Sequence, residues 1–134
     1  MAASADGQDL QYPPHTVARA DQALRCSPFR LPLFAQMRSD SIPVSTIAGE
    51  RGVQHGYAQR SLSELAAERE LGWLISVGLL RREVDGQGIT DSFRLTPLGR
   101  QLVAKWEARG GSWPAPSLGE RLRDRLNRWL RLSL

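Results

Sequence analysis

The segment from Gly78 to Trp106 constrains the fold more than any other part of this chain. Gly78 suits the left-handed conformation that ends a helix, and the Gly-Gln-Gly of residues 86–88 predicts a tight turn between two short strands. In the second strand apolar and charged residues alternate, which gives that strand one apolar face. Thr96 and Pro97 then suit the N-cap and the first position of a helix. The segment therefore predicts a helix end, a two-stranded ribbon and a capped helix.

Residue patterns with helical spacing predict four helices before the ribbon. Their expected ranges are residues 16–25, 28–38 and 45–52, and a long helix that starts between residues 57 and 62 and ends near residue 77. Side chains that suit their N-caps are Thr16, Ser27 and Ser45, and Ser61 with Glu64 has the spacing of a capping box. Short links join them, an extended one at residues 41–44 and a turn at residues 54–56.

Residues 28–108 resemble a winged helix-turn-helix domain of the type found in MarR-like and PadR-like bacterial regulators. Residues 45–53 are similar to the positioning helix and residues 57–78 to the recognition helix. The segments at residues 78–82 and 95–99 are similar to the wing and the helix that follows it. The chain also resembles a small, uncharacterised cyanobacterial family of this shape. The resemblance implies a DNA-binding protein that acts in transcription regulation.

The expected fold class is mainly α with a small β-hairpin (α+β), a winged helix-turn-helix with extra N- and C-terminal helices. The expected parts are a flexible arm at residues 1–15, a winged-helix domain with its N-terminal helix at 16–109, a linker at 110–116 and a basic amphipathic helix at 117–134. Two departures from the winged-helix pattern are visible. The interval from Gly52 to Gly78 is unusually long, through an extended helix or an insertion in the turn. The expected wing tip, residues 86–91, carries no Lys or Arg to hold a phosphate backbone.

If DNA is bound, the first part of the long helix is expected to enter the major groove. The candidate nucleic-acid contacts are Arg51, Gln54, His55, Tyr57, Gln59 and Arg60, with Arg94 from the wing. Glu64 and Glu68 oppose this reading, because phosphates repel carboxylates. The residues from 54 to 60 equally fit a solvated helix start, and Arg94 equally fits an ion pair with Asp91 or Glu83 on the ribbon.

The second half of the long helix is apolar all round, so it must be covered on two sides. A core-facing stripe is predicted from Leu62, Leu65, Ala66, Trp73, Val77 and Leu80. The opposite face presents Leu71, Ile75 and Leu79, which we expect to contact a terminal helix or a second subunit. This face is the reason to expect a homodimer.

The C-terminal segment predicts a capped amphipathic helix, with a capping box at Ser117 and Glu120. Its apolar arc consists of Leu118, Leu122, Leu126, Trp129 and Leu130, and arginines fill the remainder. We expect Leu122, Leu126 and Trp129 to form an interaction surface. Three uses stay open: packing on its own domain or a dimer partner, binding an anionic membrane surface through residues 117–134, and adding phosphate contacts to DNA.

Other classes of protein find little support in the sequence. No phosphate-binding glycine loop, metal cluster or Ser/His/Asp arrangement is legible, so we expect no enzyme, no metal and no cofactor. The lone Cys26 and the lack of a signal peptide or long apolar run favour a soluble cytoplasmic protein. The leading hypothesis is a small, dimeric winged-helix DNA-binding protein. The alternative is a winged-helix adaptor that contacts proteins or membranes and does not bind DNA.

Overall fold

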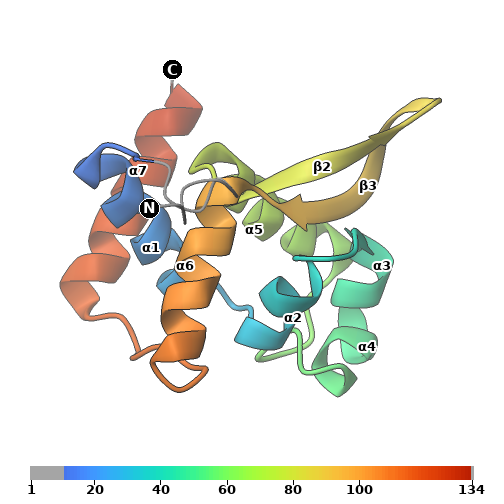
Figure 1. Ribbon diagram of the computed structural model, residues 1–134, viewed down its shortest axis with the longest axis horizontal. Coiled ribbons are helices and arrows are strands. Elements are labelled where there is room, and N and C mark those ends of the chain that lie inside the picture. Colours follow the sequence, from blue (N-terminus) through green and yellow to red (C-terminus); the bar gives the residue numbers. More distant parts are fainter. Residues whose placement is uncertain (1–10, 134) are drawn as a thin grey trace, which may run out of the picture.

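The computed structural model describes residues 11–133, and side chains as far as residue 130. This part of the chain is a mixed α+β fold in which helices pack around the root of a small antiparallel sheet, whose two longer strands project beyond them (Figure 1). In chain order the elements are α1 (Pro14–Cys26), α2 (Leu31–Gln36), β1 (Ile42–Pro43), α3 (Val44–Ile47), α4 (Gly49–Gln54), α5 (Glu64–Ser76), β2 (Leu80–Asp85), β3 (Gly88–Leu95), α6 (Pro97–Ala108) and α7 (Leu118–Ser133). The predicted α+β class is confirmed.

The ribbon forms as the sequence predicts. Strands β2 and β3 pair antiparallel from Leu80 opposite Leu95 to Asp85 opposite Gly88, and β1 adds to the other edge of β3. Gly78 has a φ of 92°, in the left-handed region, where it ends the turn after α5. The Thr96 hydroxyl accepts the Gly99 amide at 3.0 Å and caps α6. The sheet order is β1-β3-β2, so the ribbon extends from the body with β1 beside its root.

The helix before the ribbon begins later than predicted. Helix α5 starts at Glu64, and its cap is Ser63, whose hydroxyl accepts the Ala66 amide at 3.0 Å. The preceding loop is held instead by the segment before α2, because the Arg30 amide donates to the Tyr57 carbonyl at 3.0 Å. The predicted start between residues 57 and 62 is therefore wrong, and the extra length before Gly78 lies in the loop.

The predicted helix over residues 45–52 is two short helices. Helix α3 ends at Ile47, and Ala48 is extended with ψ 160°. Gly49, the first residue of α4, then has a φ of 68°. Gly52, expected to end a helix, lies buried inside α4, where an added Cβ would sit 1.8 Å from the Ile47 carbonyl oxygen.

Two other helix starts differ from the prediction. Helix α1 begins at Pro14 rather than after Thr16, so two residues of the expected arm at 1–15 belong to it, and residues 1–10 lie outside the described part. Helix α2 begins at Leu31 rather than Pro28, because the Ser27 hydroxyl donates to the Leu24 carbonyl at 2.8 Å and closes the end of α1.

A single hydrophobic core joins α1, α2, α5, α6 and the root of the ribbon. Its largest fully buried side chains include Phe29, Phe34, Phe93, Leu71, Leu74 and Leu79. Of the two covers expected for the face with Leu71 and Leu79, the terminal helix is the one found, because α1 of the same chain packs against α5, as does β2. Leu71 and Leu79 are fully buried and Ile75 is half-buried, so this face does not meet a second subunit. Leu65, expected in the core stripe, is 63% exposed because it lies in the first turn of α5, beyond the covered part.

The close approach at Gly52 yields a prediction about stability. Alanine at an ordinary helical glycine stabilises by about 0.5–1 kcal/mol. At Gly52 the new methyl group meets backbone, so Gly52→Ala should destabilise the protein by about 2 kcal/mol or more, measured by urea unfolding. Gly72→Ala is the matched control, because nothing lies within 4 Å of its added Cβ, and it should stabilise. Equal shifts for the two variants would contradict this packing.

Candidate functional site

The predicted DNA contacts at residues 51–60 lie before α5 and not in it. Arg51 and Gln54 lie on α4, and His55 is its C-cap. Tyr57, Gln59 and Arg60 lie in the loop between α4 and α5. Apart from half-buried Tyr57, which stacks on the His55 ring at a centroid distance of 5.1 Å, all are exposed. The expected place of Tyr57, Gln59 and Arg60 at the start of the long helix is wrong, because α5 starts at Glu64.

Two cations of the ribbon, Arg82 and Arg94, are paired within the chain. Arg82 of β2 donates to Glu68 of α5 at 2.8 Å, which ties the helix to the ribbon. Arg94 pairs with Glu83 at 3.3 Å across the two strands, and it also donates to the Ser39 carbonyl at 3.2 Å. Of the two alternatives for Arg94, the ion pair on the ribbon is the one the structure contains. Both guanidiniums are thus partly neutralised before any partner binds.

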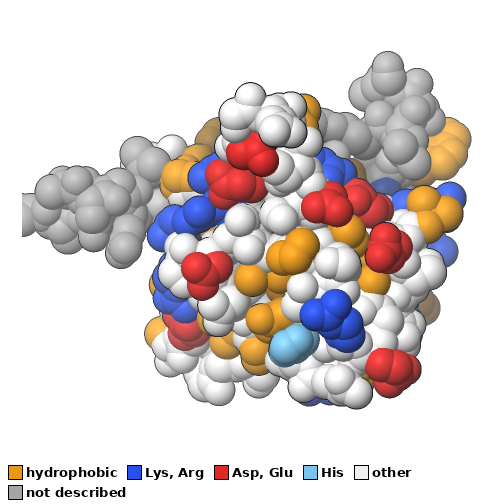
Figure 2. Space-filling view, turned by 90° about the vertical axis from the view of Figure 1, so that its right-hand side faces the viewer, with side chains coloured by type: hydrophobic (Ala, Val, Ile, Leu, Met, Phe, Trp, Pro, Cys, Tyr) orange, Lys and Arg blue, Asp and Glu red, His pale blue; other side chains and the backbone are white. Residues whose placement is uncertain are grey.

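The exposed side chains of the ribbon tip and of the first turn of α5 form a surface that we call the ribbon face. The ribbon face is apolar and acidic rather than basic. Val84 and Ile89 are partners in the sheet register and are 60% and 77% exposed, close to exposed Asp85 and Asp91. Figure 2 views this side of the molecule and shows acidic side chains spread among apolar ones, with few cations near its centre.

Helix α7 packs on α1 and α5 with its polar side inward. The Asp124 carboxylate is buried and accepts the indole N–H of Trp73 at 2.9 Å. Arg25 of α1 donates to both oxygens of Glu120, one at 3.0 Å, and Arg128 pairs with Glu70 of α5 at 3.3 Å. Polar pairs, and not the leucines, therefore orient this helix against the domain.

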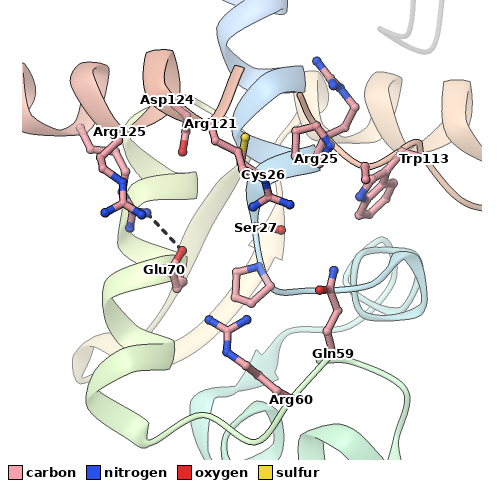
Figure 3. A pocket seen from close by; sticks show the side chains of 14 residues that line it. Arg25, Cys26, Ser27, Gln59, Arg60, Glu70, Trp113, Arg121, Asp124 and Arg125 are labelled. Atoms are coloured by element: carbon pink, nitrogen blue, oxygen red, sulfur yellow. Dashed lines mark hydrogen bonds and ion pairs between the residues drawn. The ribbon is translucent and has the colours of Figure 1, made fainter. Parts of the chain in front are cut away.

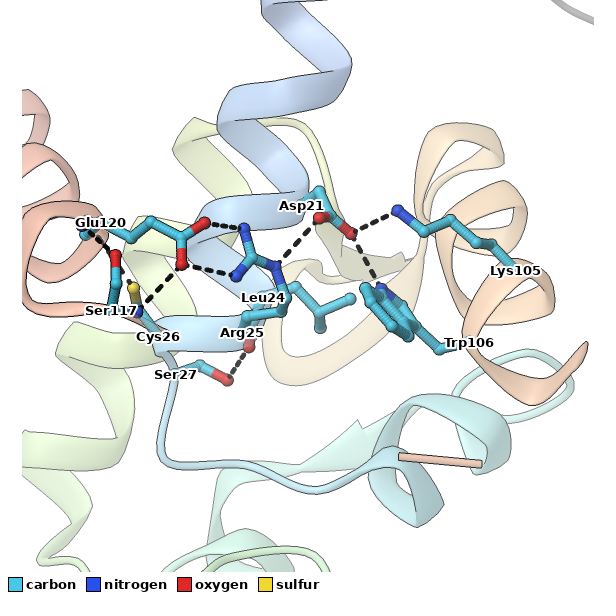
Figure 4. Close-up of polar contacts among 9 residues, drawn as sticks. All are labelled: Asp21, Leu24, Arg25, Cys26, Ser27, Lys105, Trp106, Ser117 and Glu120. Atoms are coloured by element: carbon cyan, nitrogen blue, oxygen red, sulfur yellow. Dashed lines mark hydrogen bonds and ion pairs between the residues drawn. The ribbon is translucent and has the colours of Figure 1, made fainter. Parts of the chain in front are cut away.

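The capping box predicted for this helix is confirmed. The Glu120 amide donates to the Ser117 hydroxyl at 3.1 Å, and the Ser117 amide donates to the Glu120 carboxylate at 3.0 Å. Glu120 thus serves the start of α7 and the contact with α1 at once (Figure 4).

Asp21 joins this contact to α6. Its carboxylate accepts Arg25 Nε at 3.0 Å, the Trp106 indole N–H at 2.8 Å and Lys105 Nζ at 3.2 Å. Figure 4 shows the resulting chain of polar groups from Lys105 and Trp106 through Asp21 and Arg25 to Glu120. Helix α1 is thus held to α6 and α7, which lie far from it along the chain.

The surroundings shift the pKa values of three acidic groups on or beside α7. Hydrogen bonds from Arg25 are the main cause that lowers the pKa of Glu120 to about 2. Burial raises the pKa of Asp124, although the Trp73 indole and nearby arginines work against that shift. Burial also raises the pKa of the Cys26 thiol, so Cys26 is a poor source of thiolate.

The apolar arc of α7 faces away from the domain. Leu118, Leu122 and Leu126 are 74%, 60% and 55% exposed, and Trp129 and Leu130 are also exposed. The expected interaction surface at Leu122, Leu126 and Trp129 thus lies on the outside of the chain. Leu118, Leu122 and Leu126 are each more than half exposed, so packing on the domain, one of the uses left open, does not cover these three leucines.

A polar cavity of about 390 Å³ opens between α1, α5, α7 and the α4–α5 loop (Figure 3). Five arginines and two carboxylates line it: Arg25, Arg60, Arg121, Arg125, Arg128, Glu70 and Asp124. We call it the arginine pocket. Sequence reasoning missed it, because the loop and the two helices that form it are separated by many residues. The one signal was the arginine-rich composition of α7, which gave no hint of a cavity.

These features define a small α+β protein whose arginine-rich amphipathic helix turns its apolar side outward. The chain belongs to the Npun_F0494-like family, whose model matches residues 10–128. This agrees with the resemblance to a small cyanobacterial family. The chain matches no curated protein and no solved structure. None of the helices in the described part has the length and apolar character needed to cross a bilayer.

The contact between Arg25 and Glu120 predicts how α7 responds to pH. A carboxyl whose pKa is lowered in the folded state stabilises that state above its ordinary pKa, and this contribution is lost as the pH falls through the lowered value. The attachment should therefore weaken between about pH 4 and pH 2. In an NMR titration of side-chain carboxyl groups, Arg25→Gln should return Glu120 towards its ordinary pKa of 4.5. An unchanged midpoint near 2 in this variant would contradict the assigned cause.

Proposed function

We propose that the chain is a winged-helix protein that acts as a membrane-surface adaptor, with α7 docking on anionic lipid. The order α2, β1, α3–α4, α5, β2, β3 and the sheet order β1-β3-β2 support the winged-helix part. In this reading α5 corresponds to the recognition helix and the β2–β3 ribbon to the wing. The outward face of α7 is the surface that we assign to lipid binding.

The single observation behind the function is the inverted orientation of α7. An amphipathic helix on a globular domain normally buries its apolar stripe. Here Glu120 and Asp124 face the domain and the leucines face solvent. A bilayer interface can cover such a stripe, and each half-exposed leucine would contribute about 1 kcal/mol when it enters the interface.

The charges beside the stripe favour anionic lipid as the occupant. Helical spacing places Arg121 and Arg125 along one edge of the stripe and Arg123 along the other, and all three are exposed. Both carboxylates among the described side chains of α7 point inward. Each such arginine contributes about 1 kcal/mol near an anionic membrane surface. A second copy of the same face would instead bring these arginines together.

DNA binding by the ribbon face remains a prediction that the charges do not favour. Arg82 and Arg94 are engaged by Glu68 and Glu83, and the ribbon tip presents Asp85 beside apolar side chains. Phosphate neutralisation, which supplies most of the affinity for DNA, would have to come from elsewhere. DNA and a second copy of the chain are therefore alternative occupants that the experiments must exclude.

Vesicle co-sedimentation tests the membrane proposal. The wild-type protein should bind vesicles rich in phosphatidylserine, bind phosphatidylcholine vesicles weakly, and dissociate as salt rises. Leu122→Gln with Leu126→Gln should abolish most of the binding, because glutamine keeps the helix but removes the apolar stripe. The loss should be about tenfold or more.

Leu65→Gln with Ile89→Gln is the matched control, since it removes two exposed apolar side chains from the ribbon face instead. This control should bind vesicles like wild type. Equal loss in both double variants, or no binding to anionic vesicles, would sink the proposal. A dimer in sedimentation that only the α7 variant disrupts would assign the stripe to a second copy.

A shift assay on random duplex DNA tests the other hypothesis. We expect weak binding, because Arg82 and Arg94 of the ribbon are already paired with carboxylates. Arg51→Glu with Arg60→Glu should then change this binding little. Tight, salt-dependent binding that this charge reversal removes would instead support the DNA-binding regulator.

A further inference from the structure

We propose that the arginine pocket is a binding site for a phosphate-bearing ligand whose apolar part lies in the neighbouring groove. Neither the outward face of α7 nor the ribbon face contains this whole site. The site shares Arg121 and Arg125 with the edge of the proposed membrane-binding face, but its test does not depend on membrane binding.

The first argument is the balance of charge inside the pocket. Arg25 is paired with Asp21 and Glu120, which do not line the pocket, and Arg128 is paired with Glu70, which does. The three remaining arginines, Arg60, Arg121 and Arg125, have no ion-pair partner among the described residues. The one other carboxylate, Asp124, accepts the Trp73 indole N–H and also lies near Arg125 and Arg128, so it offsets one of these charges. The pocket thus keeps an excess of positive charge over its carboxylates.

The second argument is geometry. The unpaired arginines come from opposite sides of the cavity, Arg60 from the α4–α5 loop and the others from α7 (Figure 3). Guanidinium groups that approach from two sides can each donate paired hydrogen bonds to a tetrahedral phosphate. The Ser27 hydroxyl is committed to the Leu24 carbonyl, but the Gln59 amide lines the same cavity and can donate as well.

The third argument identifies the rest of the ligand. A second cavity of about 490 Å³ shares Gln59 and Trp113 with the arginine pocket. Its other lining side chains include Phe29, Leu31 and Pro32, so it is mainly apolar. The Trp113 ring is fixed there by contact with Phe34 and Trp106, at centroid distances of 6.2 and 6.4 Å. A ligand with a phosphate and an aromatic or aliphatic part would fill both cavities across Trp113.

A phosphate of this kind can come from a soluble phosphate monoester or from a lipid with a monoester headgroup, such as phosphatidic acid. Both present the same dianionic group to the arginines. Three probes separate them: inorganic phosphate, phenyl phosphate, and dihexanoyl phosphatidic acid below its micelle concentration. Tighter binding of phenyl phosphate than of the lipid would assign a soluble source, and the reverse order would assign the headgroup.

The test is an NMR titration that follows the arginine Nε–H signals at constant ionic strength. All three probes should shift the signals of Arg60, Arg121 and Arg125 saturably, and both organic probes should bind more tightly than inorganic phosphate. Arg60→Gln with Arg121→Gln should weaken binding about tenfold or more, because charge-assisted hydrogen bonds are lost. Both side chains are exposed and unpaired, so the variant should fold.

Arg51→Gln with Arg69→Gln is the matched control, because it removes the same charge from exposed arginines that do not line the pocket. This control should keep wild-type affinity. Equal weakening in both variants, or equal shifts with chloride in place of phosphate, would overturn the proposal. Leu122→Gln with Leu126→Gln should leave phosphate binding intact, so a failure of the membrane proposal is visible separately.

Discussion

The Arg25 guanidinium holds the arrangement of helices on which the rest of this structure depends. It donates to Asp21 within α1 and to Glu120 of α7, while Asp21 also accepts from Lys105 and Trp106 of α6. Each partner is only partly buried, so the pairs keep some hydration and avoid the full desolvation penalty of a buried charge. Because this chain of contacts sets where α7 lies, it also sets one wall of the arginine pocket and the direction in which the leucines point.

The polar attachment of α7 has two consequences of opposite character. On the inner side, the Asp124 carboxylate accepts a hydrogen bond from the Trp73 indole, and the Arg128 guanidinium lies over the Trp73 ring, 5.6 Å from its centroid. On the outer side, the leucine stripe and its flanking arginines are left for another surface to cover. The proposed membrane contact uses the outer side, and the proposed phosphate site uses the cavity that the inner side closes. One helix would thus connect a surface interaction with a ligand site.

Local signals predicted the ribbon and the caps around it, because glycine turns, alternating strands and Thr-Pro caps act over a few residues. Gly78, Thr96 and the Ser117–Glu120 box all take the expected roles. The α4–α5 loop was predicted less well, because Ser61 with Glu64 has the spacing of a capping box, whereas the observed cap, Ser63, is followed three residues on by Ala66. A long-range bridge between Phe29 and Ala58 holds the loop extended, and no local pattern records it. The candidate contacts Tyr57, Gln59 and Arg60 were misplaced for this reason.

The sequence by itself determined the α+β class, the ribbon and the amphipathic character of its last helix, because these follow from periodicity and turn chemistry. Only the tertiary structure decided which side of α7 faces the domain. Both sides could have packed inward, and the partners that selected the polar side, Arg25 and Trp73, lie far from it along the chain. The arginine pocket follows the same logic, since its cations meet only after the loop, α1 and α7 are brought together.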